Sequence, residues 1–343
     1  MPANFEAIVR SVTQYTITHP DERDPWEKAP AITGILAWND PAAVAAVRRW
    51  IDRAVDTQGS EGYLCYPERI ELSVGHVRTF TPTASLSASI GFPLLDFYER
   101  TSEKRYLDAA GRQAEALARA PRTRDGGISC RYESTELWVD FTYLMCPFLA
   151  RLGRITGEKR HIDEAYAQFE IHARHLVDPL TGLSRHAWCE TPNHYPQSTF
   201  WARGNGWLIA CATDLLEIAP DHAGAEFTRT ICRKTLTAMS ELQDRSGFFR
   251  HILDDRFAKF EASATVMFAY AAAKAVKLNV VASSLLDNAV RGWNVVAGSV
   301  LDNGAVPGVA VPPGGPGVPF GTTLFGQGFF LLAAHALRDR LAV

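Results

Sequence analysis

The feature that most constrains the fold of this chain is a series of turns containing Asp and Gly, separated by long segments. Five such turns end at Gly59, Gly127, Gly182, Gly247 and Gly304 of the 343-residue sequence. Both residue types break helices, because glycine tolerates positive φ and an Asp side chain bonds its own backbone. Each interval is long enough for two ordinary helices with short connections, so the spacing predicts about six helical hairpins.

A repeated motif and helical periodicity support this architecture. The stretches Thr101-Ser-Glu-Lys-Arg-Tyr-Leu-Asp108 and Thr156-Gly-Glu-Lys-Arg-His-Ile-Asp163 each place a polar turn before an amphipathic segment. Segments with a helical period are Pro41–Val55, Tyr106–Arg119, Ile162–Leu176, Ala225–Leu242, Ala262–Lys277 and Gly326–Leu341. We therefore predict an all-α array in one domain spanning residues 1–343. Periodicity alone is compatible with both an open solenoid and a closed ring.

Composition narrows the class of protein. The hydrophobic content of 47% can supply a sizeable core. The net charge is −3, and the sequence has no run of Lys and Arg with interleaved aromatics of the kind that binds a nucleic-acid backbone. Residues 1–20 lack the basic start and apolar core of a secretory signal, and no 18-residue apolar run occurs. We expect a cytoplasmic protein that binds neither nucleic acid nor a membrane.

The cysteines and histidines favour neither disulfides nor a metal site. The six cysteines, which form no CxxC pair, are Cys65, Cys130, Cys146, Cys189, Cys211 and Cys232. Reduced thiols are expected in a chain of this length. His172 and His175 fit one helix face, but no further ligand lies at a recognisable spacing. We expect no metal and no cofactor.

The segment Val306–Thr322 is too rich in Pro and Gly to be helical. It predicts a long loop just before the last helix. Long ordered loops in compact domains are often lids, whereas a plain connector is the alternative.

Asp140 is the first candidate for chemistry, because it lies in the apolar and aromatic run Leu137-Trp-Val-Asp-Phe-Thr-Tyr143. A charged carboxylate is rarely buried without a partner. Apolar surroundings disfavour the ionised form, which keeps such an acid able to donate a proton. The alternative is an Asp that ties two helices together.

The stretch Trp201-Ala-Arg-Gly-Asn-Gly-Trp207 is the second candidate. Each of its two glycines weakens a helix by about 1 kcal/mol relative to Ala. The stretch therefore predicts a loop in which the glycines serve the function by letting a ligand approach the backbone. Two indoles offer flat faces for a sugar ring, and Arg203 offers a planar fork for a carboxylate. His186 and Trp188 lie in another predicted loop, where His186 is a candidate to polarise or orient a substrate group; the alternative is a structural histidine. Together these residues indicate an acidic-sugar site.

Over nearly its whole length, the chain resembles the unsaturated uronyl hydrolases of glycoside hydrolase families 88 and 105. The resemblance is strongest to the unsaturated rhamnogalacturonyl hydrolases of family 105. It is carried by Trp138-Val-Asp140, Asp163-Glu-Ala165, Thr181-Gly-Leu183, His186-Ala-Trp188 and Trp201 to Trp207, with weaker matches at Trp26-Glu27, Phe260-Glu-Ala-Ser-Ala264 and Gly326-Gln-Gly328.

This resemblance implies an (α/α)6 barrel and an enzyme that acts on a small oligosaccharide. In such enzymes an acid protonates C4 of a 4,5-unsaturated uronic acid, water adds at C5, and the hemiketal opens to release the aglycone. The resemblance assigns the acid/base role to Asp140 and a substrate contact to His186. The substrate-binding residues it implies are Trp138, Tyr143, Trp188, Trp201, Arg203, Asn205 and Trp207.

The chain departs from the family pattern at Ser85-Leu-Ser-Ala-Ser-Ile-Gly91, where these hydrolases usually carry a second aspartate. Whether Glu133 or Glu136 takes its place is open at this stage. The alternatives are a different glycosidase or a sugar isomerase on the same barrel, or a binding protein that has lost catalysis. The retained Asp140 favours an enzyme.

Overall fold

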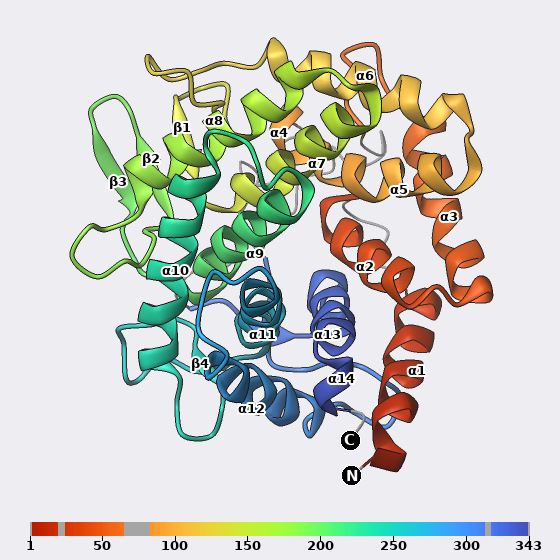
Figure 1. Cartoon of the computed structure of the whole chain (residues 1–343), viewed down its shortest axis with the longest axis vertical. Coiled ribbons are helices and arrows are strands. Elements are labelled where there is room, and N and C mark those ends of the chain that lie inside the picture. The colour runs from red at the N-terminus through yellow and green to blue at the C-terminus, as the bar shows by residue number, and fades with distance from the viewer. Residues whose placement is uncertain (1, 20–24, 65–82, 313–316, 342–343) are drawn as a thin grey trace.

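In the computed structural model, which describes residues 2–19, 25–64, 83–312 and 317–341, helices form an inner ring and an outer ring (Figure 1). The inner helices are α2 (Pro25–Trp38), α5 (Gly91–Thr101), α7 (Asp140–Thr156), α9 (Ala202–Ile218), α11 (Ala262–Lys277) and α13 (Leu324–Ala336). The outer helices are α1 (Pro2–Thr18), α3 (Pro41–Asp56), α6 (Lys104–Ala118), α8 (Lys159–Leu176), α10 (Ala225–Leu242) and α12 (Leu285–Ala297).

Burial explains which helices lie inside. Helix α3 buries only Ala43, Val47, Ile51 and Ala54, which form one stripe at helical spacing. Helix α9 buries every residue from 202 to 216. A helix with one apolar stripe packs with its other face in water, whereas a helix buried all round belongs in a core.

The inner ring is closed. Each inner helix contacts the next one, and α13 packs along α2, so the first and last hairpins meet. The two helices lie side by side in Figure 1. The fold is therefore a closed (α/α)6 barrel. Of the two arrangements that periodicity allows, an open solenoid and a closed ring, the structure shows the ring.

Gly328 makes this closure possible. A Cβ atom at position 328 would lie 2.3 Å from the carbonyl carbon of Pro30 and 2.4 Å from the nitrogen of Ala31. We expect Gly328→Ala to lower the free energy of unfolding by about 1–3 kcal/mol, because backbone atoms must separate to admit the methyl group. Chemical denaturation measures this loss. Gly111→Ala is the control, since its Cβ meets nothing within 4 Å; equal stability of both variants would contradict the close contact.

The repeated sequence motif is one helix–helix turn used twice. The hydroxyls of Thr101 and Thr156 each accept a hydrogen bond of 3.2 Å from the amide two residues later. The intervening Ser102 and Gly157 have φ values of 60° and 76°. These turns join α5 to α6 and α7 to α8, as the motif predicts.

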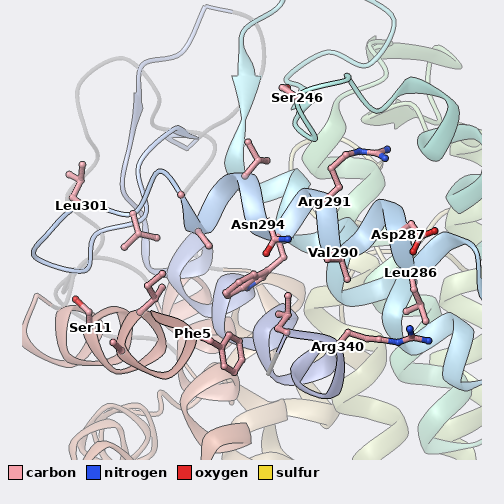
Figure 2. A pocket seen from close by; sticks show the side chains of 18 of the residues that line it. Phe5, Ser11, Ser246, Leu286, Asp287, Val290, Arg291, Asn294, Leu301 and Arg340 are labelled. Atoms are coloured by element: carbon pink, nitrogen blue, oxygen red, sulfur yellow. The ribbon is translucent and has the colours of Figure 1, made fainter. Parts of the chain in front are cut away.

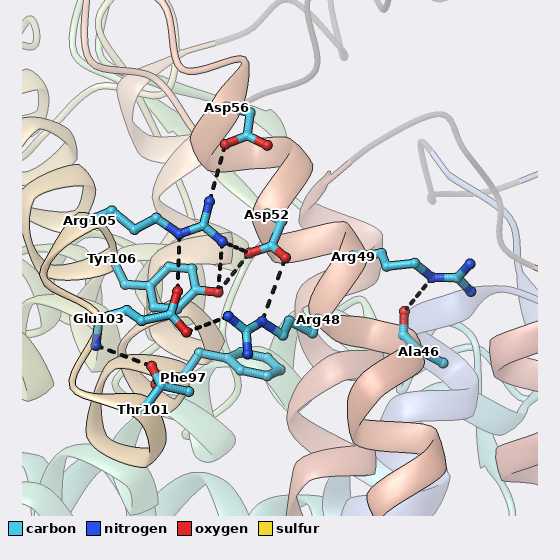
Figure 3. Close-up of polar contacts among 10 residues, drawn as sticks. All are labelled: Ala46, Arg48, Arg49, Asp52, Asp56, Phe97, Thr101, Glu103, Arg105 and Tyr106. Atoms are coloured by element: carbon cyan, nitrogen blue, oxygen red, sulfur yellow. Dashed lines mark hydrogen bonds and ion pairs between the residues drawn. The ribbon is translucent and has the colours of Figure 1, made fainter.

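Charged side chains join α3 to α6 beside the first of these turns (Figure 3). Asp52 accepts a hydrogen bond of 2.6 Å from the Tyr106 hydroxyl and pairs with Arg48 and Arg105. Glu103 also pairs with both arginines. Desolvation by burial raises the pKa of Tyr106, and its hydrogen bond to Asp52 adds to the shift, so this hydroxyl stays a donor.

The glycine turns are confirmed with one adjustment. Gly182, Gly247 and Gly304 have positive φ, as predicted. At the first two turns, however, the residue with positive φ is a different glycine, Gly62 or Gly126, and its amide donates the hydrogen bond that closes the turn.

The strands are short and antiparallel. They are β1 (Glu136–Trp138), β2 (Ala187–Cys189), β3 (His194–Gln197), β4 (Phe249–Arg250), β5 (Phe260–Glu261), β6 (Val309–Ala310) and β7 (Phe320–Gly321). Three of them form the sheet β1-β2-β3, while β4 pairs with β5 and β6 with β7. The short elements α4 (Ala84–Ser87), a 3-10 turn (Ala88–Ile90) and α14 (Arg338–Leu341) complete the described chain. The described part of the predicted loop 306–322 is non-helical and contains the pair β6–β7.

No helix in the described ranges is both long enough and apolar enough to cross a bilayer. Five of the six cysteines are free and buried, as expected, and they are Cys130, Cys146, Cys189, Cys211 and Cys232. Cys65 lies outside the described residues.

Candidate functional site

A cavity opens at the N-terminal ends of the inner helices. Most of its lining comes from α4 and from the first two turns of α2, α7 and α9. The lining residues are Trp26, Leu86, Trp138, Asp140, Phe141, Leu144, Trp201, Arg203, Trp207 and Pro312. Helix N-termini carry partial positive charge, so this end of the barrel favours an anionic ligand.

Asp140, which lines the cavity, lies against His186 because two chain segments pair there. Strand β1 ends at Trp138, α7 begins at Asp140, and the amide of Val139 donates to the carbonyl of His186 at 3.0 Å. This places His186 Nε2 3.1 Å from Asp140 Oδ2. The imidazole also packs against the rings of Trp138 and Trp201, with centroids 5.3 and 4.5 Å away.

Several polar atoms in this wall are buried without hydrogen-bond partners. Within the described chain they are Asp140 Oδ2, both ring nitrogens of His186, Trp201 Nε1 and Trp26 Nε1. The 3.1 Å approach between Asp140 and His186 satisfies the distance for an ion pair, but its angles are not those of a hydrogen bond. Buried polar groups are nearly always paired, so these atoms indicate where a polar ligand binds.

The prediction of a loop at residues 201–207 is wrong. Helix α9 begins at Ala202, and Gly204 and Gly206 lie inside its first two turns. A Cβ atom would lie 2.8 Å from Val139 Cγ1 at position 204 and 3.0 Å from Met267 Cβ at position 206. These glycines therefore permit close packing of α9 on its neighbours, which compensates for their low helix propensity.

Arg203 is held firmly in the wall of the cavity. Its guanidinium lies 4.5 Å from the Trp201 ring and 4.8 Å from the Phe325 ring. Its Nη1 donates to the carbonyl of Ala310 at 2.7 Å and lies 3.5 Å from Glu261 Oε1. Burial lowers the pKa of Arg203, while Glu261 and Asp140 oppose that shift. A fixed, desolvated guanidinium binds a carboxylate more strongly than an exposed one.

Four residues expected to contact substrate are outside this lining, and His186, which lies behind Asp140, is one of them. Trp188 stacks on His175, with centroids 3.8 Å apart. The amide of Asn205 bonds the backbone of Ser184 and Trp201, which fixes the segment leading to His186. Tyr143 packs behind Trp207, with centroids 5.1 Å apart, and burial raises its pKa well above the ordinary value.

The structure shows where the stretch 85–91 and the two nearby glutamates lie relative to the cavity. The stretch 85–91 contributes Leu86 to the cavity. Glu133 is exposed, and Glu136 accepts a hydrogen bond from Trp138 and pairs with Arg131. Of the described lining residues, Asp140 is the one carboxylic acid.

Sequence reasoning missed Leu86, Phe141, Leu144 and Pro312 as lining residues, and Trp26 entered only through the resemblance. Four of these five are aliphatic or aromatic side chains in ordinary helical segments. No local pattern distinguishes such a residue from one in the core. The exception is Pro312, which comes from the segment interpreted as a lid.

A larger groove lies on the outer wall between α1 and α12, beside the short α14 (Figure 2). Its lining includes Phe5, Val290, Trp293 and Leu301, with Arg291 at its edge. None of the described unpartnered polar atoms lies there. The cavity at the inner helix ends therefore remains the candidate site.

The histidine pair on α8 has structural contacts. His172 is buried and its Nδ1 lies 2.8 Å from the carbonyl oxygen of Gln168. His175 lies 2.8 Å from Asp125. No group of three or more possible metal-binding side chains occurs in the described ranges.

His172 is expected to make the protein sensitive to acid. Burial lowers its pKa from 6.5 to about 4, so the folded state holds the neutral form. Neutral His172 contributes its full share to the free energy of unfolding above pH 6.5. This contribution is lost as the pH falls toward 4, which lowers the free energy of unfolding by up to about 3 kcal/mol. Denaturant titrations at several pH values should show that His172→Asn loses less free energy of unfolding on acidification than the parent protein does. The exposed His194→Asn is the control; an unchanged pH profile for His172→Asn would refute this contribution.

Comparison with known proteins gives a consistent result. A family model described as Glycosyl Hydrolase Family 88 matches residues 5–340. Over 207 residues the chain is 31% identical to "Unsaturated rhamnogalacturonyl hydrolase YesR" of Bacillus subtilis (strain 168), covering 57% of this chain and 60% of that protein. It is 25% identical over 177 residues to an "Unsaturated 3S-rhamnoglycuronyl hydrolase" of Alteromonas sp. (strain LOR), covering 49% of this chain and 42% of that protein. Both matches span less than two thirds of the relative's length.

Solved structures share the fold. A possible member of the GH105 family from Salmonella enterica superimposes with a TM-score of 0.85 at 23% identity, covering 99% of this chain and 95% of that one. The unsaturated glucuronyl hydrolase of Bacillus sp. GL1 superimposes with a TM-score of 0.73 at 14% identity, covering 99% and 97%. These likenesses confirm the predicted (α/α)6 barrel.

Proposed function

Because the chain belongs to glycosyl hydrolase family 88, we propose that it removes a 4,5-unsaturated uronic acid from the non-reducing end of a small oligosaccharide. The observation that carries this proposal is the set of buried, unpartnered atoms on Asp140, His186 and Trp201 beside the guanidinium of Arg203. An acid, a cation and several indoles around one cavity suit a planar, anionic sugar.

Binding is assigned to the aromatic walls and to Arg203. The indoles of Trp26, Trp138, Trp201 and Trp207 offer flat faces or edges to the ring. Arg203 receives the carboxylate, and the N-terminal ends of the inner helices add partial positive charge. The name of the Bacillus subtilis relative supports a sugar acid as the substrate.

Asp140 is the proton donor in this proposal. Its carboxylic acid protonates C4 of the enol ether, and the cationic charge that develops at C5 is taken up by water. Asp140, now a carboxylate, accepts the proton that this water loses. The hemiketal at C5 opens to a ketone, the ring oxygen becomes the aldehyde oxygen at C1, and the aglycone leaves. His186, 3.1 Å away, orients Asp140 and a substrate hydroxyl.

The proposal is tested with unsaturated disaccharides prepared by a polysaccharide lyase. We expect the ultraviolet absorbance of the conjugated double bond to disappear as the aglycone is released. The saturated disaccharide of the same composition is the control and should stay intact. Cleavage of the saturated compound at an equal rate would favour an ordinary glycosidase, and binding without turnover would favour a protein that has lost catalysis.

A further inference from the structure

The indole of Trp138 is held by its own set of polar contacts. Trp138 ends β1 and lines the cavity. Its ring meets His186 edge-on at 5.3 Å and Phe141 at 6.3 Å between centroids. The orientation of this indole therefore shapes the cavity wall and limits the imidazole beside Asp140.

Glu136 and Arg131 both contact the indole of Trp138. Glu136 Oε2 accepts a hydrogen bond of 2.8 Å from Trp138 Nε1. The same oxygen lies 3.0 Å from Arg131 Nε, and the Arg131 guanidinium lies 4.9 Å from the indole centroid. The side chain of Arg131 is 18% exposed and that of Glu136 is 14% exposed. Shielding from water makes such contacts stronger than those of surface ion pairs.

Glu136 is itself held by hydrogen bonds to the turn that precedes β1. The hydroxyl of Ser134 donates to Glu136 Oε1 at 2.6 Å. The amide of Glu136 donates to Ser129 Oγ, and its carbonyl accepts from Cys130, both at 3.0 Å. Both carboxylate oxygens and the backbone of Glu136 are therefore engaged, which leaves this carboxylate no role as a proton donor to a ligand.

From these contacts we propose that Glu136 and Arg131 are positioning residues that fix the indole of Trp138 for stacking on the sugar. This inference rests on the proposed function. A sugar ring stacks on an indole only when the two planes are aligned, and a side chain fixed before binding loses less entropy on binding. Glu136 thus acts through Trp138 and does not take the place of the missing acid.

The test separates positioning from acid catalysis by steady-state kinetics on an unsaturated disaccharide. Glu136→Ala removes the acceptor for the indole and is expected to raise KM about fivefold while kcat stays within about twofold. Glu136→Gln keeps a neutral acceptor and should restore KM nearly to the parent value. If Glu136 donated the proton, Glu136→Gln would lower kcat about 100-fold. The exposed neighbour Glu133→Ala is the matched control and should leave both constants unchanged.

Arg131→Ala gives a second, independent answer if Glu136→Ala fails to fold. It removes the guanidinium from the indole face, and a raised KM with unchanged kcat supports the inference. If a folded Glu136→Ala or Arg131→Ala enzyme has the same KM as the parent protein, the inference is wrong. Inactivity of the parent protein on every unsaturated disaccharide would instead refute the proposed function.

Discussion

Asp140→Asn is expected to lower kcat by about 100-fold or more, with little change in KM. The amide keeps the shape of the carboxyl group, but it has no acidic proton to transfer to C4. Asp140 is the one acid in the described lining, so no neighbour is available to replace it. Turnover and melting temperature measured on the same preparation test this expectation.

Asp163→Asn is the matched control, because Asp163 also lies beside a histidine, with 2.9 Å to His222, but on the outer surface. This variant should keep full turnover. If Asp140 only ties helices together, Asp140→Asn will melt several degrees lower and stay active once folded. A folded, fully active Asp140→Asn enzyme removes Asp140 from the mechanism.

Arg203→Lys is expected to raise KM by about 10- to 100-fold with a smaller effect on kcat. Lysine retains the charge, but it cannot reproduce a planar fork stacked between Trp201 and Phe325. Hydrogen bonds to a charged group are worth about 1.5–3 kcal/mol, which corresponds to this range of affinity. Kinetics on the unsaturated disaccharide measure the change.

Arg250→Lys is the control for Arg203→Lys. Arg250 also stacks on an aromatic ring, Phe260 at 4.7 Å, and donates to a backbone carbonyl, but it is outside the cavity lining. This control should leave KM unchanged. If Arg203→Lys lowers the melting temperature and leaves KM unchanged, Arg203 is a structural residue that ties α9 to the segment at Ala310.

Much of the fold follows from local pattern. The predicted segments 225–242 and 262–277 coincide with α10 and α11, because a helical pattern of apolar residues bounded by turn signals specifies a helix locally. The last segment, 326–341, proves to be α13 and the separate α14. Ring closure depends on contact between residues about 300 positions apart, such as Pro30 and Gly328, and no periodicity encodes it.

The candidate site is less visible in the sequence. Asp140, Trp201 and Arg203 stand out because a charge or large aromatic groups occur in an unexpected setting, and the structure places all three around one cavity. The interpretation of Gly204 and Gly206 is wrong, since the low helix propensity of glycine is overcome by tertiary packing against Val139 and Met267. The polar groups of Trp188 and Asn205 are engaged by partners that sequence spacing does not reveal.

The most direct test of the account is one turnover experiment in D2O containing H2(18)O, with the product reduced at once by borohydride and analysed by mass spectrometry. Protonation of the double bond by a group in exchange with solvent predicts one deuterium at C4 and the labelled oxygen at C5. In Asp140→Asn, formation of this product should be about 100-fold slower. A product that keeps its double bond and carries the labelled oxygen at C1 would contradict hydration and identify direct cleavage of the glycosidic bond.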